Sequence, residues 1–186
     1  NISKFPMESL WTSLSGTYNL LYAFQKSNAK NFIFPSSGKV YGKPSYLPFD
    51  EQHPLNPTTP LGRIKKLCED MVLHFSTISD KSFSILRIFN VYGPNMMFND
   101  GRVISNFVLQ ALLNKDITIY GTGEQSRSFM YIDDCVDGIY KIMNSDVSEP
   151  LNLGTDGLIT INELVDIVSS VAGKNLIKKH DLTKPQ

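Results

Sequence analysis

Two polar side chains, far apart in the sequence, have the chemistry to act together on a sugar hydroxyl. Ser37 stands at the end of a short apolar run, and Lys65 lies one turn beyond the start of a later helical pattern. A serine hydroxyl can donate or accept a hydrogen bond, and a lysine ammonium offers several donors and a positive charge. A lysine on an amphipathic helix is also often simply exposed to water, so its residue type alone leaves both roles open.

A short strand and a long helix are expected to position these two residues. Asn31–Pro35 is an aromatic and β-branched run, which predicts a buried strand. The range Pro44–Pro57 holds four prolines and little periodicity, which indicates a loop. Thr59 can cap the next helix and Pro60 suits its first position, so we predict a helix from there to about Ile78. Its apolar stripe consists of Leu61, Ile64, Cys68, Met71, Val72 and Phe75.

The rest of the chain continues to alternate between strand and helix patterns, which predicts an α/β fold with a parallel sheet. The expected strands are Ser82–Phe89, Ile117–Tyr120, Ser128–Ile132 and Leu151–Leu153. The expected helices cover 7–28 and Arg102–Leu113, and a further one runs from Asp133 or Asp134 to Met143. A last helix is expected to begin at the capping box of Thr160 and Glu163 and to end near Gly173. Asp133 and Asp134 are interpreted as a helix cap and a first-turn charge, not as a catalytic carboxylate pair.

Composition narrows the class of protein. The 186 residues are 41% hydrophobic and 19% charged, which is typical of one globular domain. Eighteen basic residues balance eighteen acidic ones, so we expect neither nucleic acid nor a membrane as a partner. Neither a signal-peptide pattern nor an apolar run of about 20 residues is present, and a cytoplasmic location is expected.

Cysteine and histidine usage predicts neither a disulfide nor a metal site. Cys68 and Cys135 both fall inside helical patterns and are expected to be reduced core residues. His53, His74 and His180 show no ligand spacing with each other or with the cysteines.

Five motifs, in this order, resemble one enzyme family over nearly the whole chain. They are SSGKVYG, LRIFNVYGP, NDGRVISNFVLQAL, TIYGTGEQSRSFMYIDD, and PLNLG followed by TINEL. The chain resembles the extended short-chain dehydrogenase/reductases that act on nucleotide sugars, namely UDP-glucose 4-epimerases, dTDP-glucose 4,6-dehydratases and UDP-glucuronate decarboxylases. The stretch from Asn99 to Asp134 and the run MNSDVSEPLNLG look most like the decarboxylases.

The resemblance implies the C-terminal part of a Rossmann-type parallel sheet with helices on both faces, plus a smaller α/β substrate-binding domain. Residues 1–94 would be the C-terminal half of the NAD-binding domain, intermixed with later segments. Residues 95–186 would mainly form the nucleotide-sugar-binding domain, incomplete at its C-terminus. The family begins with a glycine-rich turn, GxxGxxG, that this sequence lacks, so we expect a fragment in which the strand at Asn31–Pro35 exposes an edge.

The family's catalytic pattern is a serine or threonine followed by YxxxK. The resemblance places Ser37 and Lys65 on the hydroxyl and lysine positions, but it places Leu61 on the tyrosine position. Lys39 stands where similar dehydratases and decarboxylases usually carry glutamate, and Gly38 stands where several carry serine or aspartate.

By resemblance, a tyrosinate takes the proton from the sugar 4-hydroxyl while hydride passes to NAD, which Lys65 and Phe89 would help to bind. Leu61 cannot act as this base, and its helical stripe instead predicts that it packs in the core. Tyr41 is a substitute phenol to which we give little weight, because active family members share its VYG turn.

The expected substrate is a nucleotide sugar, a UDP-sugar in preference to a dTDP-sugar. Asn90 follows a strand end and can donate to a diphosphate or sugar oxygen, and Arg127 offers a fork for phosphate, although a surface salt bridge is its alternative role. By resemblance the same pocket is lined by Arg102, Val103, Asn106, Tyr120 and Gln125.

The sequence therefore predicts an NAD-dependent nucleotide-sugar epimerase, dehydratase or decarboxylase acting at the sugar C4, with its activity in doubt at Leu61. The alternative is a non-catalytic nucleotide-sugar-binding or partner subunit of the same fold. The resemblance also implies a homodimer through helices 7–28 and 59–78. Neither the sugar nor the reaction outcome follows from the sequence.

Overall fold

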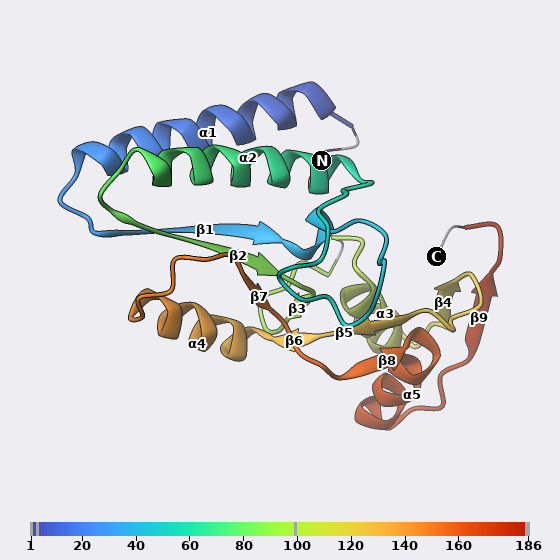
Figure 1. Cartoon of the computed structure of the whole chain (residues 1–186). Coiled ribbons are helices and arrows are strands. Elements are labelled where there is room, and N and C mark those ends of the chain that lie inside the picture. Colours follow the sequence, from blue (N-terminus) through green and yellow to red (C-terminus); the bar gives the residue numbers. More distant parts are fainter. Residues whose placement is uncertain (1, 3, 99, 185–186) are drawn as a thin grey trace. The chain divides into compact units, whose positions relative to one another are not determined.

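The computed structural model of the chain describes residues 2, 4–98 and 100–184 and divides into two compact units. Unit 1 consists of Asn1–Phe89 and Asp134–Gly154, and unit 2 consists of Asn90–Asp133 and Thr155–Gln186. Each unit combines helices with strands, so the predicted α/β class is confirmed (Figure 1).

Unit 1 is built on a parallel sheet of strands β1 (Asn31–Ser37), β2 (Ser82–Ile88) and β7 (Leu151–Leu153), in the order β1-β2-β7. In the register of this sheet Ser37 lies beside Ile88, so the carboxyl ends of β1 and β2 lie together. Polar residues that follow these strands therefore gather at one edge of the sheet.

Helices cover both faces of this sheet. Figure 1 shows α1 (Pro6–Lys26) and α2 (Pro60–Thr77) side by side on one face, with α4 (Ile132–Met143) on the other. The core between the sheet and the first two helices consists of Leu21, Phe24, Phe34, Ile64, Cys68, Val72, Phe83 and Ile85. The predicted cap of α2 is confirmed, because the Thr59 hydroxyl accepts a hydrogen bond of 3.1 Å from the Gly62 amide.

β1 lies at the edge of its sheet, and within the described residues no strand pairs with its outer side. Beside it is a cavity of about 500 Å³ whose lining is mainly apolar; it includes Ile33, Pro35, Leu86, Ile88, Ile139 and Met143. The cavity lies between this sheet and α4, which contributes Ile139 and Met143 to its lining.

Unit 2 is assembled from short strand pairs and two helices. β3 (Val91–Tyr92) pairs with β6 (Met130–Tyr131), β4 (Ile117–Tyr120) with β9 (Lys178–Asp181), and β5 (Ser126–Ser128) with β8 (Leu158–Thr160). The helices are α3 (Val103–Leu112) and α5 (Ile161–Ala172). They pack around a core of Phe107, Ile117, Ile119, Ile161, Leu164 and Val165.

The predicted strand over Ser128–Ile132 is wrong as one element. β5 ends at Ser128, and β6 holds only Met130 and Tyr131, because the two segments pair with different partners. Helix α4 already begins at Ile132, so Asp133 and Asp134 lie in its first turn and neither caps it.

Local signals at the other helix ends are confirmed. The Thr160 hydroxyl accepts from the Glu163 amide at 3.1 Å, and the Glu163 carboxylate accepts from the Thr160 amide at 2.7 Å, which is the predicted capping box. Cys68 and Cys135 are free and buried, as predicted.

In the described part of the chain, no helix is long and apolar enough to cross a membrane. Over the same residues, no three histidine, cysteine or acidic side chains are grouped closely enough to hold a metal ion.

Candidate active site

Ser37 is the last residue of β1 and caps a short 3-10 turn, Gly38–Val40. Its hydroxyl oxygen accepts a hydrogen bond of 3.3 Å from the Lys39 amide. Among the described residues the Ser37 hydroxyl hydrogen has no acceptor, and the side chain is only half-buried. The hydroxyl is therefore free to donate to a bound molecule.

Lys65 reaches from α2 to the same end of β1. Its Nζ donates to the Pro35 carbonyl at 2.6 Å and lies 4.9 Å from the centre of the Phe34 ring. Burial lowers the pKa of the Lys65 ammonium from its ordinary value, because part of its hydration is lost. The ammonium keeps further N–H donors for a ligand hydroxyl, such as those of a ribose. The donor set thus fits the nicotinamide-ribose contact that the resemblance implies for this lysine.

Leu61 lies one turn before Lys65 on α2, and the prediction that it packs in the core is wrong. Its side chain is 36% exposed, whereas the neighbouring Gly62 is buried against the rest of unit 1. The first inward-facing position of α2 is taken by Gly62, so the buried apolar stripe begins at Ile64. An exposed leucine beside Lys65 supplies no acid or base.

Tyr41 cannot replace the missing phenol in this arrangement. Its side chain is fully buried, its hydroxyl donates to Asn152 Oδ1 at 2.7 Å, and it accepts from Arg87 Nη1 at 3.0 Å. Burial is the main cause of a raised pKa of the Tyr41 hydroxyl, which disfavours the tyrosinate that proton abstraction needs. This agrees with the little weight given to Tyr41 from sequence.

Phe89 lies against the turn that follows Ser37. A Cβ atom at Gly38 would lie 2.7 Å from Phe89 Cε1, closer than real side chains approach. A side chain at position 38 would therefore displace the Phe89 ring, which also stacks beside Tyr41 with centroids 6.4 Å apart. Lys39, by contrast, is exposed.

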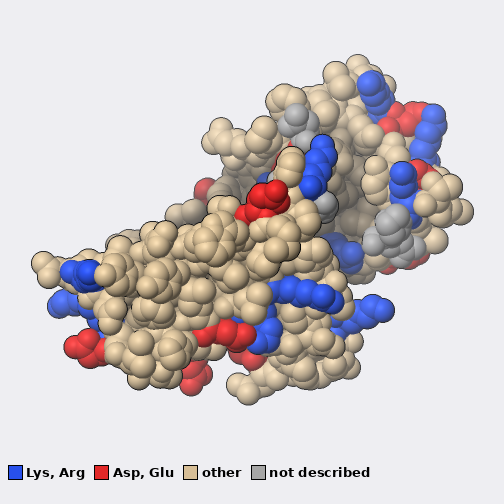
Figure 2. All heavy atoms as spheres, turned by 90° about the horizontal axis from the view of Figure 1, so that it is seen from above, with Lys and Arg blue, Asp and Glu red and all other residues tan. Residues whose placement is uncertain are grey.

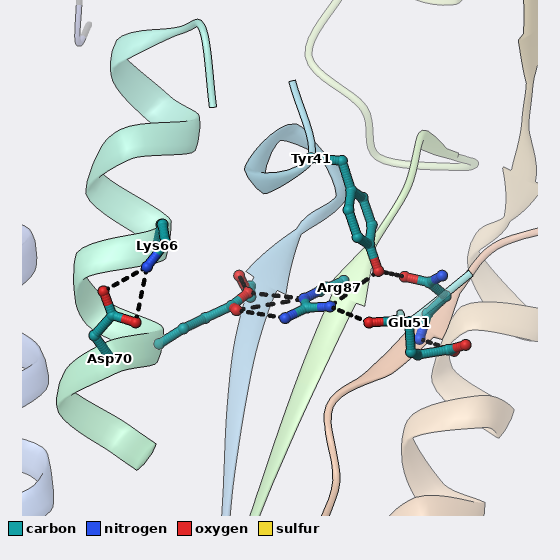
Figure 3. A network of polar contacts seen from close by, with 8 residues as sticks. Tyr41, Glu51, Lys66, Asp70 and Arg87 are labelled. Atoms are coloured by element: carbon teal, nitrogen blue, oxygen red, sulfur yellow. Dashed lines mark hydrogen bonds and ion pairs between the residues drawn. The ribbon is translucent and has the colours of Figure 1, made fainter. Parts of the chain in front are cut away.

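A buried polar network behind the site has no counterpart in the sequence-based prediction (Figure 3). Arg87 from β2 pairs with Glu69 from α2, with 3.0 Å between Nη2 and Oε2. Glu69 Oε1 also accepts a hydrogen bond from the Ser36 hydroxyl, and Arg87 Nη1 also donates to Tyr41. The one available signal was an arginine inside the apolar run SFSILRIF.

In unit 2, Arg127 offers unused hydrogen-bond donors. Its Nη1 donates to the carbonyl of Ser126 at 2.8 Å, and the side chain is exposed. Within the described residues no carboxylate pairs with Arg127, so the alternative role of a surface salt bridge has no partner there. Asn90 is already engaged, because its amide group donates to the Ser128 carbonyl at 3.1 Å.

The predicted substrate-binding residues around α3 differ in whether they are already paired or buried. Arg102 is paired with Asp100 at 2.6 Å, and hydrogen bonds from Ser105 and from the Arg102 amide lower the pKa of Asp100 to about 2. Val103 packs against the core of unit 2, and Asn106 is half-buried in the first turn of α3. Arg102 would have to share its guanidinium between Asp100 and a ligand.

Tyr120 is the last residue of β4, and Gln125 lies on the loop that follows it. Gln125 Nε2 donates to the Tyr120 carbonyl at 3.1 Å, while its Oε1 is buried without a partner within the described residues. The Tyr120 side chain is 51% exposed. An unpartnered acceptor and an exposed aromatic ring are groups that can accept from and stack on a nucleobase.

Lys65 is expected to lose its proton at lower pH than Lys141, whose pKa is raised chiefly by a hydrogen bond to Asp137. Burial disfavours the charged form of Lys65, so the pKa of Lys65 is expected to lie below that of Lys141. Carbon-13 NMR titration of the lysine Cε signals checks this. Equal midpoints, or a later one for Lys65, would contradict the described burial. Because the folded pKa is the lower one, this group makes stability rise with pH between its folded and unfolded pKa values.

Comparison with known proteins gives the same family as the motifs. The sequence model described as the NAD dependent epimerase/dehydratase family matches residues 3–154. UDP-glucuronic acid decarboxylase 1 of Xenopus tropicalis is 36% identical over 173 residues, covering 90% of this chain and 41% of that protein. The chain thus spans less than half the length of that relative.

Solved structures agree. A UDP-N-acetylglucosamine 4-epimerase from Methanobrevibacter ruminantium M1, in complex with UDP-N-acetylmuramic acid, matches with a TM-score of 0.92 and 28% identity, covering 99% of this chain and 61% of that one. A UDP-glucuronic acid 4-epimerase from Bacillus cereus, in complex with NAD, matches with a TM-score of 0.84 and 28% identity, covering 91% and 55%. NAD is the cofactor of the family. This chain belongs to the NAD dependent epimerase/dehydratase family.

Proposed function

We propose that this chain serves NAD-dependent hydride transfer at C4 of a nucleotide sugar, and that Leu61 makes this reaction slow. The observation that carries the proposal is the arrangement at the end of β1. There the Ser37 hydroxyl and the Lys65 ammonium both keep free donors, while the residue one turn before Lys65 is leucine.

Each retained residue has a role that its contacts allow. The Ser37 hydroxyl would donate to the sugar C4 oxygen, and Lys65 would hold ribose hydroxyls with the N–H groups not used by Pro35. NAD supplies the hydride acceptor when it is bound. Tyr41 cannot take the C4 hydroxyl proton as a tyrosinate does, since it is buried and hydrogen-bonded. Loss of a general base costs about 10²–10⁴ in rate.

Nucleotide-sugar binding is the better preserved part of the proposal. Unit 2 offers the unpaired guanidinium of Arg127 for a diphosphate, and the orphaned Gln125 Oε1 for an N–H donor. The imide N–H of uracil or thymine is such a donor. The decarboxylase and epimerase relatives carry UDP-sugars in their names, which favours UDP over dTDP.

A binding module without redox chemistry is the second candidate. The burial of Tyr41 and its hydrogen bonds to Asn152 and Arg87 favour it. This class keeps the Arg127 and Gln125 contacts but needs no proton acceptor near Ser37. Substitution at position 61 separates the two candidates.

Replacing Leu61 with tyrosine is expected to raise NAD-linked turnover of UDP-sugars by up to about 10²–10⁴-fold, because it puts a phenol one turn before Lys65. Leu73→Tyr, at another exposed leucine of α2, is the control. The measurement is the rate at which the UDP-sugar is converted, followed by chromatography with NAD present, because the hydride returns to the sugar and NADH does not accumulate. No gain, together with unchanged UDP affinity, would reject the slow-enzyme candidate and favour the binding module.

Replacing Arg127 with methionine is expected to weaken UDP binding by roughly tenfold or more, as loss of a charge-assisted contact predicts. Arg63→Met in unit 1 is the matched control, since Arg63 is also exposed and makes only a 3.4 Å contact to the Pro57 carbonyl. Isothermal titration with UDP and with uridine measures both. Equal losses for UDP and uridine would show that Arg127 does not bind phosphate.

We also propose that two copies pair through α1 and α2. The exposed face of α1 carries large apolar residues at helical spacing, namely Met7, Trp11, Tyr18 and Tyr22, and α2 adds Leu67. Seen from the side of these helices, the surface of unit 1 is largely uncharged (Figure 2). An apolar face of this kind is typical of protein interfaces.

Trp11→Lys is expected to convert the pair to single copies, because Trp11 is 73% exposed at the centre of this face. Tyr140→Lys, at an exposed aromatic residue of α4, is expected to leave the pair intact. Analytical ultracentrifugation gives the masses. A monomer mass for the unaltered protein would end this proposal.

A further inference from the structure

Helix α2 holds the segment from Pro35 to Lys39 at successive positions along one of its faces. Gly62 lies so close to this segment that a Cβ atom would be 2.3 Å from the Lys39 carbonyl oxygen. Lys65 Nζ donates to the Pro35 carbonyl at 2.6 Å, and Glu69 accepts from the Ser36 hydroxyl. Spacings of three and four residues put these side chains on the same face of a helix.

Glu69 is itself held in place by hydrogen bonds from Arg87. Arg87 Nε lies 3.3 Å from both carboxylate oxygens of Glu69, and Arg87 Nη2 lies 3.0 Å from Oε2. Both side chains are almost completely buried. The Ser36 contact is therefore anchored to β2 through the ion pair, so it does not depend on α2 alone.

Ser37 lies between these contacts. Residues 35 and 36 before it are bound by Lys65 and Glu69, and residue 39 after it rests on Gly62. The position of the Ser37 hydroxyl relative to the Lys65 ammonium is thus set in part by Gly62 and Glu69, neither of which contacts the Ser37 hydroxyl.

We propose that Gly62 and Glu69 are positioning residues for the Ser37 and Lys65 pair. Gly62 allows α2 to approach the turn after Ser37, and Glu69 fixes the strand before it. The functional meaning of this positioning rests on the proposed function, in which Ser37 and Lys65 act on one bound pair of molecules. The structural coupling itself can be measured in the ligand-free protein.

The first test is Gly62→Ala, whose methyl group would push the Lys39 carbonyl away from α2. The matched control is Gly16→Ala in α1, where a Cβ would meet nothing within 4 Å. The readout is the NMR titration midpoint of Lys65, recorded without ligand. We expect it to move up in Gly62→Ala, because a loosened Lys65 regains water, and to stay unchanged in Gly16→Ala.

The second test is Glu69→Asp, which keeps the charge but shortens the side chain so that it cannot reach both Ser36 and Arg87. Its control is Asp70→Glu, at the adjacent exposed partner of Lys66 (Figure 3). The Glu69 carboxylate itself favours the charged form of Lys65, so in Glu69→Asp its displacement lowers the Lys65 pKa while regained water raises it. Ser36→Ala removes the contact to Glu69 and leaves this carboxylate unaltered, so the upward shift of the Lys65 midpoint is expected there, and no shift is expected in Asp70→Glu.

A general loss of stability would lower the melting temperature and leave the Lys65 midpoint in place, which would overturn the proposal. So would shifts of equal size in the control variants. Circular dichroism of each variant shows separately whether it is folded. If the unaltered protein binds no UDP while the Lys65 shifts occur, the proposed function fails and the positioning stands.

Discussion

The ion pair between Arg87 and Glu69 is the interaction on which the organisation of unit 1 depends. Removing two charges from water is costly, and the cost is recovered only if every donor and acceptor is satisfied. Here Nε and Nη2 of Arg87 donate to the two carboxylate oxygens of Glu69. The Ser36 hydroxyl also donates to Glu69, and Arg87 Nη1 also donates to Tyr41. Removing one partner of such a pair typically costs about 3–5 kcal/mol, so the pair couples β2 to α2 strongly.

The network extends beyond the pair to the loop before α2. The Tyr41 hydroxyl donates to Asn152 Oδ1 on β7, and Asn152 Nδ2 in turn donates to the Phe49 carbonyl at 3.1 Å. A proline-rich loop without regular structure is thereby held by strands at both sides of the sheet. The site residues occupy a rigid frame even though the loop between them has no helix or strand of its own.

The helices, and the caps of α2 and α5, were predictable from sequence because they depend on neighbours in the chain. Thr59 before Pro60, and Thr160 three residues before Glu163, carry their own partners within one turn. The division of Ser128–Ile132 between β5 and β6 was not predictable, because it depends on which distant strands pair with each half. Likewise, the exposure of Leu61 follows from the close approach of Gly62 to Lys39, which no periodicity shows.

The contact between Gly38 and Phe89 bears on how this site can change over time. Lys39 is exposed and can be exchanged for an acidic residue without disturbing its surroundings. A side chain at position 38 requires the Phe89 ring to move, because a Cβ there would lie 2.7 Å from Phe89 Cε1. A hydroxyl or carboxylate introduced at position 38 therefore also changes the packing of the ring that stacks beside Tyr41. Positions 38 and 89 are thus coupled, whereas position 39 can change alone.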